Sequence, residues 1–275
     1  MGDHLKFVLV ERRDEIATIW LNHPARMNVL SRRMMDELTA TFTEVGSSDV
    51  TGVILAAKGK IFSAGHDFAE MAGEDLAGSR ALFATCTSMM NALQSMPQPV
   101  VARVHGLATG AGCQLVATAD LAVAAEEASF ATPGGKGGLF CTTPLVAVGR
   151  LIGRRRALEM GMSGDAIDAA TAASWGLVNQ VVPTATLDEA TVELLRRVTR
   201  GSTESKAIGK AAFYTQIDLE QSKAYAFASE VMAAAALTAD AQEAIVAFIE
   251  KRAPRWRNET TPALVPPALV SPANR

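Results

Sequence analysis

The chain contains few of the residues on which several common kinds of protein site depend. Among its 275 residues there are three cysteines and four histidines. The cysteine count is odd, and the spacing of Cys86, Cys113 and Cys141 matches no metal-binding motif. We therefore expect reduced thiols in an intracellular compartment, with neither a disulfide framework nor a zinc site. The histidines are scattered along the chain, which argues against a metal centre.

An excess of basic charge is also absent. The formal net charge is −3 and the isoelectric point is about 5.9, whereas a nucleic-acid partner usually requires a basic face. No uninterrupted apolar run reaches the length of a membrane span. The first residues, MGDHLKFVLVERRDE, carry charges within the first apolar run, unlike a signal peptide. We therefore expect a soluble cytoplasmic protein that binds neither nucleic acid nor membrane.

What the chain does have is an apolar core and a regular alternation of strands and helices. Hydrophobic residues make up 49% of the sequence. Short runs at 7–11 and 16–21 are typical of a hairpin, and buried-type strands are expected at 52–56, 100–104 and 121–124. Ser31 is placed to cap a helix whose apolar positions are Met34, Leu38, Phe42 and Val45. This alternation predicts an α/β fold with a mostly parallel sheet.

Strand signals become rare after about residue 144. The remaining helical runs are expected at 145–162, 165–175, 187–198, 205–215 and 221–251. We therefore divide the chain into an α/β core at 1–195 and a C-terminal helical region at 196–257. The tail at 258–275 is rich in proline and has no periodicity, so no fixed structure is expected there.

Two glycine-rich segments carry the candidate chemistry, FSAGHDF at 62–68 and HGLATGAGCQLV at 105–116. Small residues allow a ligand to approach the backbone, and the first amides of a helix lack an intrahelical partner. The amides of Ala64 and Ala111 are therefore candidate donors to a developing oxyanion. Two other interpretations stay open: a tight turn needed only for helix–strand packing, and a surface or capping role for His66 in place of a polar wall beside a ligand.

Five sequence features together resemble one known family. They are LNHPARMNVLSRRMMDEL, FSAGHDF, VHGLATGAGCQL, the proline at 133 and EAIVAFIEKRAPRW, in the family's order and spacing from about 7 to 256. They are similar to the crotonase (enoyl-CoA hydratase/isomerase) superfamily. GLFCTTP and KAAFYTQ resemble its divergent branch called enoyl-CoA hydratase domain-containing protein 3.

The resemblance implies a crotonase-like spiral of ββα units with a C-terminal helical trimerisation region. It implies a homotrimer or a dimer of trimers that binds an acyl-CoA or enoyl-CoA thioester, with coenzyme A as part of the substrate and no separate cofactor. Carried over by position, the carbonyl would lie between the amides of Ala64 and Ala111. The coenzyme A channel would be lined by Ala25, Arg26, Met27, Ala64, Gly65, His66 and Asp67. Phe248 and Lys251 match positions that reach a neighbouring subunit's ligand; for Lys251, a solvated helix end is the alternative.

The sequence departs from the family at its two catalytic glutamates, which are Gln114 and Gly134 in this chain. Glutamine can hydrogen-bond a water molecule but cannot transfer a proton near neutral pH, and glycine has no side chain. General acid–base catalysis typically contributes about 10²–10⁴-fold to a rate, so ordinary hydration should be severely impaired. Lys136 and Cys141 are considered as replacements. Inert packing is favoured for Cys113 and Cys141, because the sequence places no histidine to activate them.

Three functions are compatible with these residues. The first is an enoyl-CoA hydratase or isomerase of fatty-acid metabolism, a lyase-type enzyme in which Gln114 at most orients a water molecule. The second is another reaction of a CoA thioester, such as decarboxylation or thioester hydrolysis, which can proceed without the glutamate pair. The third is an acyl-CoA-binding protein without turnover.

Overall fold

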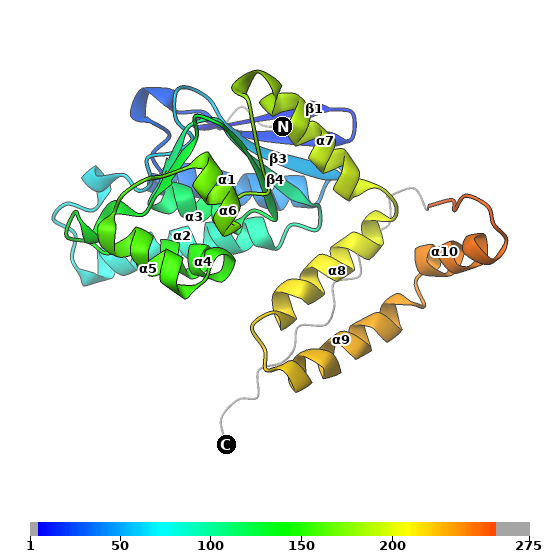
Figure 1. Cartoon of the computed structure of the whole chain (residues 1–275). Helices are drawn as coiled ribbons and strands as arrows, with labels where there is room; N and C mark the ends of the chain where they lie inside the picture. The colour runs from blue at the N-terminus through cyan, green and yellow to red at the C-terminus, as the bar shows by residue number, and fades with distance from the viewer. Residues whose placement is uncertain (1–4, 257–275) are drawn as a thin grey trace. The chain divides into compact units, whose positions relative to one another are not determined.

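The computed structural model describes residues 5–256, and the chain divides into two compact units, Met1–Val198 and Thr199–Arg275. Figure 1 labels the helices of both units and three of the strands, β1, β3 and β4. The division falls at the end of helix α7 (Leu187–Thr199), whereas the sequence placed it between 195 and 196. The tail predicted at 258–275 lies outside the described residues.

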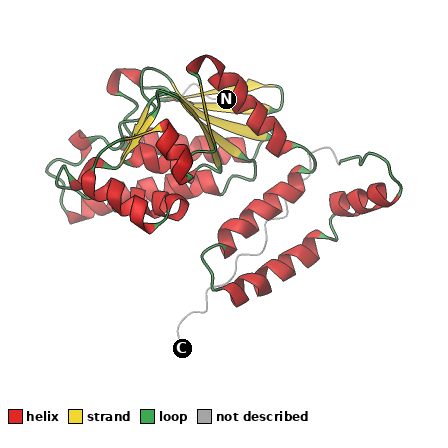
Figure 2. Cartoon of the chain, viewed as in Figure 1, coloured by secondary structure: helices red, strands yellow, loops and turns green. Residues whose placement is uncertain are grey.

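The first unit is built on a six-stranded sheet, drawn in yellow in Figure 2. In spatial order its strands are β1 (Val8–Arg13), β2 (Ile16–Leu21), β3 (Gly52–Ala57), β4 (Val100–Val104), β6 (Leu121–Ala125) and β9 (Gln180–Val182). The β1–β2 pair is an antiparallel hairpin, and every other neighbouring pair is parallel. The predicted hairpin and the mostly parallel sheet are therefore confirmed.

A second, three-stranded sheet was not predicted. It contains β5 (Leu107–Thr109), β7 (Ser129–Ala131) and β8 (Ile167–Asp168). Each strand is two or three residues long, too short to show an alternating pattern in the sequence. This small sheet matters for the site, because β5 leads through Gly110 directly into helix α3 (Ala111–Thr118).

The central strand β3 shows how the core is built. All six of its residues are buried. Val53, Leu55 and Ala57 belong to the larger apolar cluster, and Ile54 and Ala56 belong to a second cluster that includes the buried leucines of α7. Successive side chains of a strand point to opposite faces, so both faces of this sheet are covered. This explains why the strand is continuously apolar in sequence.

Six more helices complete the first unit. They are α1 (Arg32–Gly46), α2 (Leu76–Gln94), α3, α4 (Pro144–Ile152), α5 (Arg154–Ser163) and α6 (Ala169–Trp175). The Ser31 hydroxyl accepts a hydrogen bond from the amide of Met34 at 3.2 Å, so the predicted cap is confirmed. The helix expected at 145–162 is interrupted at Gly153, whose φ of 80° ends α4 before α5 begins. Helix α2 was not predicted.

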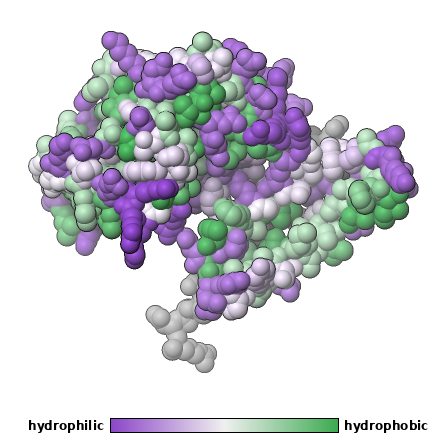
Figure 3. Space-filling model, in the orientation of Figure 1, coloured by the Kyte–Doolittle hydropathy of each residue, from purple (hydrophilic) through white to green (hydrophobic). Residues whose placement is uncertain are grey.

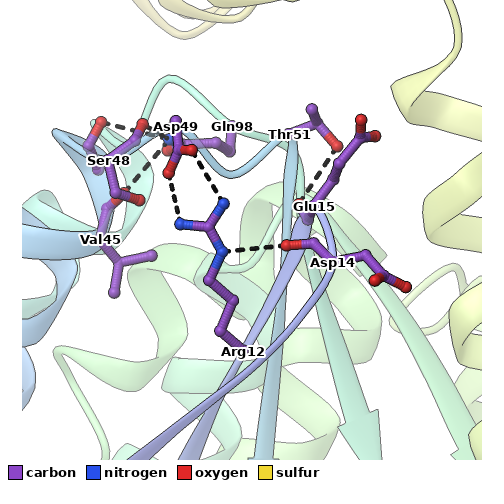
Figure 4. Close-up of polar contacts among 9 residues, drawn as sticks. Arg12, Asp14, Glu15, Val45, Ser48, Asp49, Thr51 and Gln98 are labelled. Atoms are coloured by element: carbon purple, nitrogen blue, oxygen red, sulfur yellow. Dashed lines mark hydrogen bonds and ion pairs between the residues drawn. The ribbon is translucent and has the colours of Figure 1, made fainter.

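Polar contacts fix the hairpin turn against the loop that follows α1 (Figure 4). The Arg12 guanidinium pairs with both carboxylate oxygens of Asp49, and its Nε donates to the carbonyl of Asp14 at 3.0 Å. The Thr51 hydroxyl donates to the carbonyl of Glu15 at 3.3 Å. These contacts hold the turn beside the start of β3 and so help to set the strand register.

Up to residue 256, the second unit contains helices α8 (Thr203–Gln216), α9 (Gln221–Ala235) and α10 (Ala239–Ile249), which confirms the predicted C-terminal helical region. The expected continuous helix at 221–251 is two helices, because Thr238 starts α10 by accepting a hydrogen bond from the amide of Ala241. Within the described residues no single helix is long and apolar enough to span a membrane. Only α9 and α10 counted together reach that length and composition, and they are bent by 74° at the break.

Candidate functional site

Three segments that are distant in sequence lie side by side in the first unit. The amide of Thr109 donates to the carbonyl of Ser63 at 3.0 Å, which joins the first glycine-rich segment to the second. The Ser63 hydroxyl donates to the carbonyl of Asn28 at 2.8 Å. The amide of Leu30 donates to the carbonyl of Gly65 at 2.7 Å. The structure thus brings together the residues around 24–30, 63–67 and 107–112 that the sequence singled out.

Gly65 is one point at which the two glycine-rich segments approach each other closely. Its φ is 83°, a region that L-residues with side chains rarely adopt. A Cβ at this position would lie 2.8 Å from the carbonyl oxygen of Thr109 and 3.2 Å from the amide nitrogen of Ala111. Glycine is therefore required here by both the backbone conformation and the available space. Because it has no side chain, the start of α3 can pack directly against the backbone of residues 64–66.

The structure corrects the assignment of Ala64 as an oxyanion donor. Its amide already donates to the carbonyl of Met27 at 3.0 Å. That hydrogen bond pairs residues 24–30 with the first glycine-rich segment, so the Ala64 amide serves the fold and is not free for a ligand. The sequence could not reveal this partner, because Met27 is far away along the chain.

Among the amides of this region, those of His66 and Ala111 have no acceptor within residues 5–256. Ala111 is the first residue of α3, where an amide has no intrahelical acceptor and lies at the positive end of the helix dipole. His66 directly follows Gly65, and a Cβ added to Gly65 would lie 3.2 Å from the Ala111 nitrogen. Of the two amides predicted as donors, that of Ala111 is therefore unpaired and that of Ala64 is not, whereas the neighbouring His66 amide is unpaired.

The residues predicted to line a coenzyme A channel share this part of the molecule. Ala25 and Arg26 lie in a short 3₁₀ turn, Pro24–Arg26, and Met27 follows it with a φ of 52°. The Arg26 guanidinium is 3.1 Å from the carboxylate of Asp67, whose side chain is only 8% exposed. Asp67 also accepts a hydrogen bond from the amide of Ala69 and so caps the short 3₁₀ turn Phe68–Glu70.

In the described part of the chain, the Leu30 backbone and the Glu70 carboxylate are the polar groups that act on the His66 imidazole. Neither ring nitrogen makes a hydrogen bond of normal geometry there, although both are shielded from solvent. The ring packs edge-on against Phe83 of α2, with the two centroids 5.5 Å apart. Burial lowers the pKa of His66, and the smaller effects of the Leu30 backbone and the Glu70 carboxylate act in the opposite direction. The neutral imidazole is therefore the main form at pH 7.

Gln114 lies on α3 one turn from Ala111 and is 6% exposed. Its Oε1 is buried and has no hydrogen-bond donor among residues 5–256. The Oγ1 of Thr132, which is fully buried just before Pro133, is likewise unpaired within that range. Buried polar atoms are rarely left without a partner, so these two oxygens mark places where a water molecule or ligand is expected. No sequence pattern had pointed to Thr132.

The position of the second family glutamate is filled by other parts of the chain. A Cβ at Gly134 would lie 1.8 Å from the carbonyl oxygen of Leu139 and 2.8 Å from the Sγ of Cys141. The Gly134 amide donates to that sulfur at 3.2 Å. Atoms of the loop at 134–141 therefore occupy the space that the first atoms of a glutamate side chain would need.

The groups considered as replacement acids or bases do not have suitable environments. Burial raises the pKa of the Cys141 thiol. The pKa of the Cys113 thiol is raised to about 12, mainly by burial and also by the nearby Cys141. Both thiols are therefore protonated at neutral pH. Lys136 is exposed and pairs with Asp165 at 3.2 Å. Within residues 5–256 no group of three or more metal-ligating side chains is close enough together to hold a metal ion.

Phe248 and Lys251 belong to the second unit. Phe248 is 85% exposed at the end of α10, and Lys251, with a φ of 55°, follows the helix. Their assignment to a neighbouring subunit's ligand stays a prediction.

Comparison with known proteins identifies the family. The family model of enoyl-CoA hydratase/isomerase matches residues 11–259. This chain belongs to that family. It is 42% identical over 247 residues to rat enoyl-CoA hydratase domain-containing protein 3, mitochondrial, covering 89% of this chain and 82% of the rat protein. The crystal structure of an enoyl-CoA hydratase from Mycobacterium smegmatis superimposes with a TM-score of 0.88 at 43% identity, covering 92% of this chain and 99% of that one.

A second solved structure agrees with the first. Human enoyl-CoA hydratase domain-containing protein 3 superimposes with a TM-score of 0.87 at 40% identity, covering 91% of this chain and all of that one. The crotonase fold of this enoyl-CoA hydratase family member is therefore established, as is its resemblance to the domain-containing protein 3 branch. The expectation of a cytoplasmic location is wrong: the relatives from rat, mouse, zebrafish and human are all named as mitochondrial.

Proposed function

We propose that this chain binds an acyl-CoA or enoyl-CoA thioester and polarises its carbonyl between the amides of His66 and Ala111. The observation that carries the proposal is the pair of unpaired amides beside the close approach of Gly65 to Ala111. Membership of the enoyl-CoA hydratase/isomerase family supports a CoA thioester as the ligand. Coenzyme A then enters as part of the substrate, and no separate cofactor is needed.

The chemistry follows from where negative charge develops. Adding a nucleophile to the β-carbon of an enoyl thioester, or removing a proton from the α-carbon, transfers electrons to the carbonyl oxygen. Preorganised backbone donors stabilise that oxyanion, and one such donor is typically worth about 10²–10³-fold in rate. The unpaired Oε1 of Gln114 can accept a hydrogen bond from a water molecule and so orient it, without taking its proton.

We assign the chain to the enoyl-CoA hydratase type of lyase or isomerase in fatty-acid metabolism. A second candidate is favoured by one observation, the filled space at Gly134. Since no carboxylate can occupy that position, a CoA-thioester reaction that needs only oxyanion stabilisation, such as decarboxylation or thioester hydrolysis, is the alternative. A homotrimer or dimer of trimers is proposed as the assembly, in which Phe248 and Lys251 would reach a neighbouring subunit's ligand.

The proposal is tested by measuring how the protein binds butyryl-CoA labelled with ¹³C at the thioester carbonyl. Calorimetry reports affinity, and infrared difference spectroscopy reports the carbonyl stretch, which falls in frequency when the oxygen accepts strong hydrogen bonds. We expect binding and a lowered stretch in the wild type. In Gly65→Ala the misplaced amides should abolish the frequency shift and weaken binding by about tenfold, because two neutral hydrogen bonds are each worth about 0.5–1.5 kcal/mol.

Gly73→Ala is the matched control. Gly73 has a φ of 79°, close to that of Gly65, but no atom lies within 4 Å of its Cβ position. The control therefore introduces the same backbone strain without the steric clash, and it should bind like the wild type. A wild type that does not bind butyryl-CoA, or binds it with an unshifted carbonyl stretch, refutes the proposed function.

A further inference from the structure

We propose that the His66 imidazole transfers protons at the α-carbon of the bound thioester, in place of the two missing carboxylates. This inference rests on the proposed function, because it needs the thioester carbonyl to lie at the His66 amide. It assigns two tasks to one residue: the backbone stabilises the oxyanion, and the side chain moves the proton.

The first argument is the unmatched hydrogen-bonding capacity of the ring. Both nitrogens of His66 are buried, and within residues 5–256 neither has a partner. A buried imidazole normally forms at least one hydrogen bond. This ring has the edge contact with Phe83 and the Leu30 backbone nearby, but no hydrogen bond of normal geometry, so its nitrogens can still bind another polar group. Burial also favours the neutral ring by lowering its pKa, so a basic nitrogen is available at pH 7.

The second argument is covalent reach. A carbonyl oxygen bound by the His66 amide lies about 2.9 Å from that nitrogen. The α-carbon of the same acyl group is two bonds beyond that oxygen. It therefore lies within the length of one side chain from the His66 backbone. Gly134 has no room for an acidic side chain, and Gln114 on α3 cannot transfer a proton. Of the two residues whose amides form the proposed donor pair, His66 has a titratable side chain and Ala111 does not.

The charged surroundings of the ring are simple. Glu70, in the short turn after Asp67, is the carboxylate that acts on it. The neighbouring Asp67 is paired with Arg26, and α2 contributes the uncharged Phe83.

The proton-transfer step is balanced. The lone pair of a ring nitrogen takes the α-proton, the electrons of the C–H bond form the enolate double bond, and the carbonyl π electrons move to the oxygen held by the two amides. The imidazolium then returns a proton to the α-carbon. In the hydration direction, the imidazole takes a proton from water as the oxygen bonds to the β-carbon, and the imidazolium protonates the α-carbon.

The test uses butyryl-CoA in D₂O, because a saturated thioester cannot be hydrated but can exchange its α-hydrogens. Mass spectrometry follows deuterium incorporation, and calorimetry gives affinity for each protein. We expect exchange by the wild type and a rate about 10²–10⁴-fold lower in His66→Phe, with affinity unchanged. Phenylalanine keeps the aromatic contact with Phe83, so loss of packing is not the cause. Added imidazole should partly restore exchange in His66→Ala.

His105→Asn is the matched control. His105 is also half-buried with a pKa lowered by burial, but its Nε2 is 2.9 Å from the carbonyl oxygen of Gly59. It should exchange at the wild-type rate. Two results would overturn the role of His66 but leave the proposed function intact. One is deuterium exchange that persists in His66→Phe, and the other is a wild type that binds butyryl-CoA without exchanging its α-hydrogens. A wild type that does not bind butyryl-CoA refutes both proposals.

Discussion

Gly134 shows how the surroundings of a single residue can exclude a side chain. The Leu139 carbonyl and the Cys141 thiol occupy the positions that the first atoms of a side chain would need. The position where the resemblance implies a family glutamate therefore has no open space for one. A substitution that restored the family's residue would have to displace backbone, and cores tolerate such overpacking poorly.

We predict that Gly134→Ala destabilises the protein by about 1–3 kcal/mol, since its methyl group would meet the Leu139 oxygen at 1.8 Å. Gly137→Ala, in the same loop, is the control, because the nearest atoms to its Cβ position are 3.8 Å away. Urea unfolding of both variants measures the difference. Equal stability of the two variants would show that the loop at 134–141 adapts freely, and Gly134→Glu would then be a feasible restoration.

Among the elements, α1 is joined to the start of β1 by one carboxylate. Glu37 accepts hydrogen bonds from the amides of Lys6 at 2.9 Å, Phe7 at 2.7 Å and Val8 at 3.2 Å, and its other oxygen accepts from Arg33 at 2.9 Å. Burial alone would raise the pKa of Glu37, but these donors outweigh it and the net shift is downward. The carboxylate thus fixes the edge strand of the larger sheet to the helix that covers it.

The lowered pKa makes this link dependent on pH. A carboxyl group whose pKa is lower in the folded state stabilises the fold above its unfolded pKa, near 4.5, and the stabilisation is lost as the pH falls through the folded value. We predict that Glu37→Gln lowers the free energy of unfolding by about 1–3 kcal/mol at pH 7, and by progressively less below pH 4.5. Urea unfolding across this range measures it.

Glu44→Gln is the control for that experiment, because Glu44 is exposed on the same helix. It should leave stability unchanged at every pH. A Glu37→Gln effect that is independent of pH would mean that shape, and not the charge of the carboxylate, holds the strand.

At the scale of the whole molecule, the second unit exposes large apolar side chains. Met232, Leu237, Phe248 and Ile249 are between 72% and 85% exposed, and apolar side chains gather over α9 and α10 in Figure 3. Exposed apolar surface of this kind usually marks an interface between proteins. It supports the proposed association of identical chains through the helical region.

We predict that light scattering gives the mass of a trimer or of a dimer of trimers, and that Phe248→Asp shifts it towards the monomer by placing a charge in an apolar interface. Lys223→Asp, at an exposed position of α9, makes a comparable change of charge and should not alter the mass. A wild type that is monomeric at all concentrations, or a Phe248→Asp variant that associates normally, would contradict the prediction.

The sequence by itself determined most of the architecture. The hairpin, the long parallel strands, the Ser31 cap of α1 and the C-terminal helices follow from apolar periodicity and capping chemistry, which are local properties. Their positions therefore agree with the structure. The strands of the small sheet and the break at Gly153 escaped notice, because two or three residues show no period and a φ of 80° leaves no mark on the apolar pattern.

The tertiary structure alone decided which groups of the candidate site are available. The sequence pattern favoured the amide of Ala64, which is bonded to the Met27 carbonyl, over that of His66. It also left open what replaces the glutamate at 134. Both answers depend on partners distant along the chain. A residue's type sets what it can donate or accept, but only the fold determines whether that capacity has already been used.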